Sequence, residues 1–181
     1  MDEERAWIEQ ALRGDQAAFG HLVQAYERPV YNLTYRLLND PAEAEDAAQE
    51  AFLRAYNKLA TYQPERKFAN WLLSIASHYC IDILRRRGRA PELSLDGPLP
   101  PQWLASDGER PDQMVDRKQQ QAHIRLLLDT LEPAYRAAVV LRYWYDLSYE
   151  EIAETMGTTE SAIKSRLHRA RRMLAERLQA A

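Results

Sequence analysis

Seven side chains that donate hydrogen bonds recur at helical spacing near the carboxyl end of the chain. Serine, histidine, lysine and arginine are residue types that bind base edges and phosphate oxygens. Residues 157–181 carry six cations against the two carboxylates of Glu160 and Glu176, and phosphate attraction needs such a local excess. The pattern therefore predicts a DNA-contacting helix. Its candidate residues are Ser161, Lys164, Ser165, Arg166, His168, Arg169 and Arg172.

The neighbouring residues predict a helix-turn-helix that presents this basic helix. Ser148 and Glu151 match a capping box, so a first helix is expected from Tyr149. Gly157 should end it, and Thr159 should cap the second helix. The competing interpretation is a surface helical hairpin with a solvated basic face. The residues expected on the buried sides are Ile152, Ala153 and Met156, then Ile163, Leu167, Ala170, Leu174 and Leu178.

An acidic helix face is predicted in the first third of the chain. Asp46 and Glu50 are like charges one helical turn apart, and Gln49 lies on the same side. The apolar stripe of this helix faces the other way. The pattern fits either a solvated acidic face or a docking surface for a basic partner.

The periodicity of the remaining segments predicts an all-α protein of two small helical domains. Apolar residues recur at a period of 3.6, and no alternating strand pattern occurs. Residues 90–113 contain five prolines and are expected to form a Pro-rich linker. The domains are therefore predicted to cover residues 1–89 and 114–181, and the second carries the helix-turn-helix.

Composition excludes several other classes of protein. The chain has 181 residues and a net charge of −3, yet acidic residues dominate up to residue 65 and basic residues dominate 66–89 and the carboxyl end. A single cysteine, Cys80, and four scattered histidines offer neither a disulfide framework nor a metal site, so no metal or cofactor is expected. The absence of a long apolar run predicts a cytoplasmic protein without membrane insertion.

Three runs of residues, in this order and spacing, resemble the extracytoplasmic-function class of bacterial RNA polymerase sigma factors. They are AEDAAQEAF at 44–52, residues 68–87 with WLLSIA at 71–76 and Asp82 before the arginines, and residues 147–174. The match is to the two-domain type that retains regions 2 and 4. It implies a non-enzymatic factor that directs core polymerase to promoters.

The resemblance also implies roles for particular residues. Asp46, Gln49 and Glu50 would dock on the β′ coiled coil of core polymerase, and the basic helix would read the −35 element as duplex DNA. The loop at 61–67 and the helix after it would hold the −10 element as a melted strand, which requires stacking and phosphate contacts. The −10 candidates are Tyr62, Arg66, Lys67, Asn70, His78, Arg85 and Arg86, with Arg87 and Arg89 as further phosphate contacts.

Two details qualify this assignment. Phe68 and Trp71 are assigned to core packing because they lie on or beside the apolar stripe, and His78 stands where the family often has asparagine. The remaining partners implied by the resemblance are the β flap of the polymerase, promoter DNA and an anti-sigma factor.

Two other classes of protein share parts of the pattern. A stand-alone helix-turn-helix regulator would have the same carboxyl end, but a receiver domain would need strands alternating with helices. An enzyme with an appended DNA-binding domain would need a nucleophile with its base or a metal cluster, and the sequence suggests neither. No catalytic residue is predicted.

Overall fold

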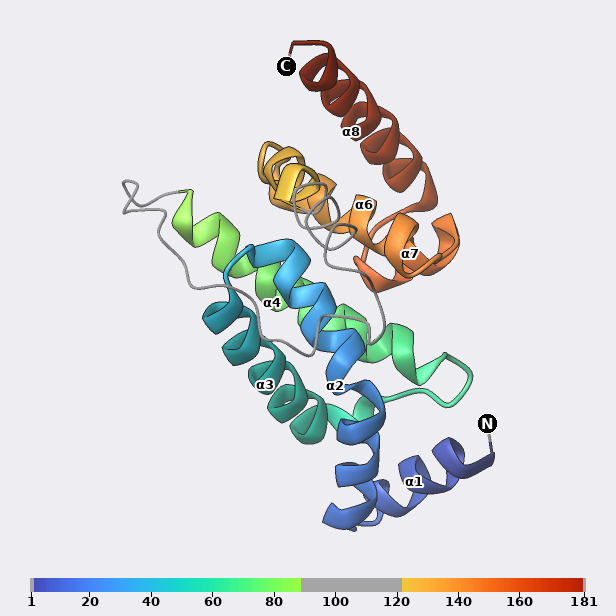
Figure 1. The fold of residues 1–181 in the computed structure, drawn as a ribbon. Helices are drawn as coiled ribbons and strands as arrows, with labels where there is room; N and C mark the ends of the chain where they lie inside the picture. The colour runs from blue at the N-terminus through green and yellow to red at the C-terminus, as the bar shows by residue number, and fades with distance from the viewer. Residues whose placement is uncertain (1, 89–121, 181) are drawn as a thin grey trace, which may run out of the picture.

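A computed structural model describes residues 2–88 and 122–180, and every regular element in these ranges is helical, as predicted. The Pro-rich segment 90–113 lies outside the described residues. The two ranges form two helical domains (Figure 1). The first contains α1 (Asp2–Leu12), α2 (Gln16–Leu38), α3 (Pro41–Lys58), the 3₁₀ turn η1 (Leu59–Thr61) and α4 (Phe68–Arg87). In the second, a helical stretch at 122–129 precedes α6 (Pro133–Trp144), α7 (Tyr149–Thr155) and α8 (Glu160–Ala180).

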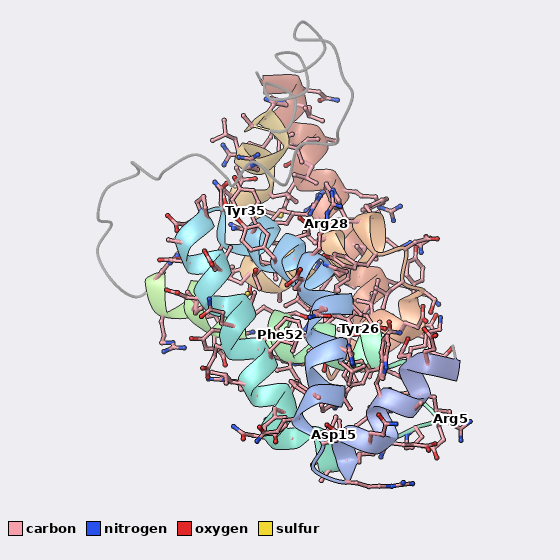
Figure 2. All side chains as sticks on the ribbon, turned by 60° about the horizontal axis from the view of Figure 1, so that its bottom comes forward. Arg5, Asp15, Tyr26, Arg28, Tyr35 and Phe52 are labelled. Carbon is pink, nitrogen blue, oxygen red and sulfur yellow. The ribbon has the colours of Figure 1, made fainter. Side chains whose placement is uncertain are left out.

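Short polar side chains set the helix boundaries of the first domain. The Asp15 carboxylate accepts hydrogen bonds from the backbone N–H groups of Ala17 and Ala18, which confirms it as the cap of α2. Figure 2 shows Asp15 at the turn between α1 and α2. Asn39 ends α2 with a left-handed φ of 58°, and Asp40 caps α3 directly afterwards. The two long helices therefore turn back on each other within two residues.

The core of the first domain lies between α2, α3 and α4. Buried Thr34 on α2 donates a hydrogen bond to the Ala44 carbonyl on α3, at 2.8 Å. Phe68 is buried and Trp71 is half-buried against it, as the apolar stripe predicted. The fully buried large side chains of this domain include Leu22, Val30, Leu33, Leu37, Leu72 and Cys80.

Cys80 is an unpaired thiol within this core, and burial raises its pKa to about 12. Among residues 2–88 and 122–180, no three histidine, cysteine or carboxylate side chains gather as metal ligands. Within the same ranges, no helix combines the length and apolar character needed to cross a membrane.

The helix-turn-helix forms as predicted, with two corrections to its buried face. Both hydrogen bonds of the capping box form: the Ser148 hydroxyl accepts from the Glu151 backbone N–H, and the Glu151 carboxylate accepts from the Ser148 backbone N–H. Gly157 follows α7 with a φ of +60°. Ile152, Ile163 and Leu167 are buried. Met156, however, is only half-buried, and Thr155 is buried beside it.

The second correction concerns the end of α8. Leu174 is half-buried and Leu178 is 55% exposed, although both lie on the predicted apolar stripe. Figure 1 shows the last turns of α8 running out beyond α7 toward the C-terminus. The stripe therefore continues past the helices that bury its first half.

The two domains pack directly on each other, through α6 and α7 on one side and α2 and α4 on the other. The buried guanidinium of Arg136 on α6 donates to the Leu37 carbonyl at the end of α2, at 2.6 Å. Arg136 also pairs with Asp129 at 2.7 Å, and Tyr145 donates to the carbonyl of Pro29 inside α2 at 2.6 Å. The sequence predicted two domains but gave no indication of this interface.

Candidate nucleic-acid and polymerase interfaces

The acidic residues of α3 form a solvent-facing surface, as their spacing predicted. Asp46 and Gln49 are exposed. Glu50 is half-buried and pairs with Arg54 at 2.7 Å, and the Arg54 guanidinium lies 4.3 Å from the centre of the Tyr79 ring. Arg54 thus offsets the repulsion between the like charges on this face.

Leu53 adds an exposed apolar side chain to the same surface. Its side chain is 61% exposed and follows Glu50 by three positions, so it stands on the face of the acidic residues. Leu53 was not predicted as a site residue, because the acidic pattern of this face comprises polar side chains only. The available signal was a leucine that falls outside the apolar stripe of α3.

Tyr62 is packed into the loop before α4 rather than extended from it. Its hydroxyl donates to the Arg66 carbonyl at 2.6 Å, and its ring centre lies 5.4 Å from both the Phe68 and Trp71 rings. Burial raises the pKa of Tyr62, with Glu4 as a further cause. Of these two −10 candidates, Tyr62 is therefore half-buried and Arg66 is exposed to solvent.

Lys67 and Asn70 both contact Glu151 of the helix-turn-helix. The Lys67 ammonium lies 2.8 Å from Glu151 Oε1, and the Asn70 amide donates to the same oxygen at 3.2 Å. The hydrogen bond from Lys67, followed by that from the Ser148 backbone, lowers the pKa of Glu151 to about 2. The same contact raises the pKa of Lys67. Two of the −10 candidates therefore meet an element of the other domain.

His78 lies farther along α4 on the side that approaches the turn of the helix-turn-helix. Its Nδ1 is 2.7 Å from the Ser74 carbonyl, and a β-carbon placed on Gly157 would lie 3.9 Å from its Nε2. The unusual histidine thus lies close to the second domain.

The arginines at the end of α4 divide into two groups. Arg85 and Arg86 are exposed, as expected of phosphate contacts. Arg87 is exposed as well, but it pairs with Glu43 on α3 and donates to the Leu38 carbonyl, so it also joins two helices of the domain; its phosphate contact stays a prediction. Arg89 lies outside the described residues.

The candidate −35 residues line one side of α8, opposite the buried side chains. The helix begins with Thr159, whose hydroxyl accepts from the Ala162 N–H at 3.2 Å. Arg166 is half-buried, which distinguishes it from the other candidates. The exposed candidates are Ser161, Lys164, Ser165, His168, Arg169 and Arg172.

Three of these cations already have partners on the protein. Lys164 pairs with Glu160 at 2.6 Å, Arg172 pairs with Glu176 at 3.6 Å, and Arg169 donates to the Tyr135 hydroxyl at 3.5 Å. The two ion pairs join residues four positions apart on an exposed helix face. Such pairs are weak, so the cations remain available for phosphate and base contacts.

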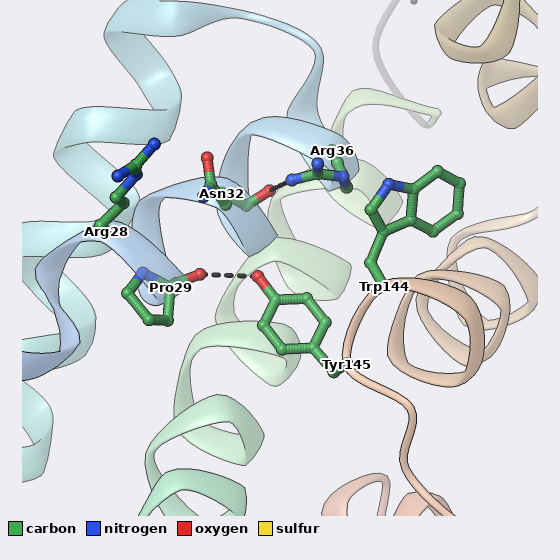
Figure 3. A pocket seen from close by; sticks show the side chains of 6 residues that line it. All are labelled: Arg28, Pro29, Asn32, Arg36, Trp144 and Tyr145. Atoms are coloured by element: carbon green, nitrogen blue, oxygen red, sulfur yellow. Dashed lines mark hydrogen bonds between the residues drawn. The ribbon is translucent and has the colours of Figure 1, made fainter. Parts of the chain in front are cut away.

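A separate cleft of about 450 Å³ opens between α2 and the end of α6 (Figure 3). Arg36 donates to the Asn32 carbonyl at 3.0 Å and lies 5.4 Å from the Trp144 ring, and burial lowers the pKa of its guanidinium. None of the predicted site residues lines this cleft. Its lining comprises Arg28, Pro29, Asn32, Arg36, Trp144 and Tyr145.

Both domains match known protein families. Residues 22–90 match the family model for Sigma-70 region 2, and residues 122–174 match that for Sigma-70, region 4. The chain is 35% identical over 178 residues to the ECF RNA polymerase sigma factor SigW of Bacillus subtilis, covering 94% of each chain. It is 32% identical to the RNA polymerase sigma-H factor of Pseudomonas aeruginosa, covering 99% of this chain and 95% of that one.

Solved structures show the same fold. CnrH, in complex with the cytosolic domain of CnrY, superposes with a TM-score of 0.71 at 24% identity, covering 99% of each chain. The sigma factor RpoE of Bartonella quintana, in complex with the anti-sigma factor NepR, gives a TM-score of 0.66 at 23% identity, covering 89% of this chain and 96% of that one. The matches to both sigma regions and the similarity to SigW establish that the chain belongs to the ECF family of RNA polymerase sigma factors.

Proposed function

We propose that this sigma factor divides promoter recognition among three surfaces. The exposed face of α3 docks on the β′ coiled coil of core polymerase, α8 reads the −35 element as duplex, and the start of α4 holds the melted −10 strand. The observation that carries this proposal is the polar face of α8, where six of the seven predicted side chains are exposed while Ile163, Leu167 and Ala170 are buried. A helix of this kind fits the major groove.

The docking surface on α3 combines charge with one apolar side chain. Asp46 and Gln49 are exposed beside Leu53. A surface of this composition suits a partner that offers cations around an apolar patch. We infer that the β flap contacts the second domain, so that both domains are held on the polymerase.

In this proposal the sigma factor supplies promoter specificity, and the cytoplasmic polymerase that it joins carries out the bond-forming chemistry. Two solved relatives of the same fold are complexes with CnrY and with an anti-sigma factor, which supports an anti-sigma factor as a further partner. A stand-alone regulator is not favoured, because residues 22–90 match sigma region 2 rather than a receiver domain.

Copurification with core polymerase, followed by run-off transcription from a panel of promoters, tests this function. Asp46→Ala with Gln49→Ala should reduce recovery of core polymerase. A matched control is Gln24→Ala with Glu27→Ala, which removes an exposed amide and an exposed carboxylate from α2 instead. Equal recovery of polymerase by the two double variants would refute docking through α3.

A further inference from the structure

The cleft between α2 and the end of α6 gathers positive charge without a carboxylate. Its lining includes the guanidinium groups of Arg28 and Arg36 and no acidic side chain. Within residues 2–88 and 122–180, neither arginine lies within ion-pair distance of a carboxylate. Two cations on one cleft wall repel each other and attract an anion.

Arg36 is the less solvated of the two cations. Its side chain is half-buried, and this burial lowers the pKa of its guanidinium, as does the nearby cation of Arg125. Its one hydrogen bond to a described residue goes to the Asn32 carbonyl, at 3.0 Å. An arginine keeps its proton in a protein, so the remaining N–H donors carry a charge that no described carboxylate offsets.

The polar groups of this wall form a row. Arg28, Asn32 and Arg36 follow one another at intervals of four positions, so they lie along one side of α2, and the row rises by about 12 Å. Figure 3 shows Asn32 between the two arginines and Trp144 beyond Arg36. The side-chain amide of Asn32 makes no hydrogen bond to a described residue. The cleft thus offers donors along its length.

Trp144 adds a ring surface at one end of the row. Its indole is 38% exposed and lies 5.4 Å from the Arg36 guanidinium. An exposed indole beside a cation stacks well with a planar ring that carries negative charge. The volume of about 450 Å³ is within the range of small-molecule sites.

We propose that this cleft binds a nucleoside polyphosphate. The base stacks on Trp144, the phosphate nearest the ribose meets Arg36, and the phosphate chain continues past the Asn32 amide toward Arg28. The proposal goes beyond promoter recognition, because none of the three promoter surfaces contributes a residue to the cleft. It therefore stands or falls independently of the proposed function.

The order of groups in the ligand makes the proposal specific. A nucleoside triphosphate places its ring at one end and its last phosphate at the other, as the row places Trp144 and Arg28. A monophosphate ends at Arg36. ATP should therefore bind more tightly than AMP, and inorganic triphosphate should bind less tightly than ATP because it lacks the ring.

Isothermal titration of the full chain with ATP, AMP and inorganic triphosphate measures these affinities. ATP should also raise the melting temperature, because it binds the folded chain and not the unfolded one. Arg28→Gln should weaken ATP by about two- to fivefold and leave AMP unchanged. Trp144→Ala should weaken both nucleotides by at least about fivefold and leave inorganic triphosphate unchanged.

Both substituted side chains are exposed, so each variant has a matched control on the surface. Arg13→Gln removes an exposed arginine from the turn between α1 and α2, and Tyr143→Ala removes a 58% exposed ring beside Trp144. Neither Arg13 nor Tyr143 lines the cleft. Both control variants should bind all three ligands as the wild type does.

Several results would overturn the proposal. Absence of ATP binding at millimolar concentration would do so, as would equal affinities of the wild type, Arg28→Gln and Trp144→Ala. Inorganic triphosphate that binds as tightly as ATP would reduce the cleft to a site for simple anions. An oligothymidylate that displaces ATP with the same dependence on Arg28 and Trp144 would assign the cleft to a nucleic-acid strand instead of a free nucleotide.

Discussion

The division of labour along α8 leads to a quantitative prediction for Lys164 and Arg172. Side chains near the amino end of a recognition helix reach base edges, and those farther along reach phosphates. Lys164 lies in the second turn of α8 and Arg172 lies eight residues later, both exposed. Lys164→Ala should therefore change the preference for −35 sequence, whereas Arg172→Ala should weaken binding to all sequences alike.

The structure sets the size of the first effect. A good base contact discriminates about 5- to 150-fold against the wrong base. Lys164 must first leave Glu160, to which it is bound at 2.6 Å, and an exposed pair of this kind offsets the gain by about twofold. The expected loss of discrimination is therefore about 3- to 70-fold.

Arg172→Ala has a different signature. Removing one phosphate contact should reduce the slope of log affinity against log salt by about 1. The Arg172 guanidinium lies 3.6 Å from the Glu176 carboxylate, so the substitution removes only a weak ion pair from the free protein. The preference among −35 sequences should remain that of the wild type.

Competition binding of the holoenzyme to −35 duplexes with single base changes, at several salt concentrations, measures both quantities. Arg5→Ala on α1 controls for the loss of one exposed cation. If Lys164→Ala and Arg172→Ala reduce affinity equally for every duplex, the assignment of base and phosphate contacts along α8 is wrong.

Three further predictions concern the other surfaces. Leu53→Ala should weaken core polymerase binding in a pull-down without changing the melting temperature, whereas Leu126→Ala, at a comparable exposure of 65%, should change neither; loss of helicity in Leu53→Ala would contradict this. Arg66→Ala with Lys67→Ala should preserve closed complexes and reduce permanganate-detected melting, and a premelted bubble template should restore transcription; equal defects on both templates would point instead to a folding or docking fault. Arg136→Ala should destabilise the chain by about 1–3 kcal/mol in urea unfolding, because it leaves the Leu37 carbonyl without its donor and removes the partner of Asp129; a loss below about 0.5 kcal/mol would show that water replaces the guanidinium.

Local patterns predicted the helices and most of the exposed site residues. Asp15, Ser148 and Thr159 cap their helices because a cap joins a side chain to a backbone N–H only two or three residues away. The outward face of α8 followed in the same way from the burial of Ile163 and Leu167. These features depend on neighbours along the chain, so the sequence contains them.

Contacts between distant residues could not be predicted in this way. The pairing of Arg87 with Glu43, for example, arises because α3 and α4 lie side by side. Leu178 lies on the predicted stripe and is exposed because α8 extends beyond its neighbours. Both outcomes depend on where one helix ends relative to another.

The sequence by itself determined the all-α fold, the helix-turn-helix and the family, since periodicity, caps and motif order are properties of short segments. Only the tertiary structure decided what Glu151 does beyond capping α7. Its bond to Lys67 joins residues 84 positions apart, and the bond from Tyr145 to Pro29 spans 116. Such pairs form only where the packing of whole helices brings two faces together, and no local spacing encodes that meeting.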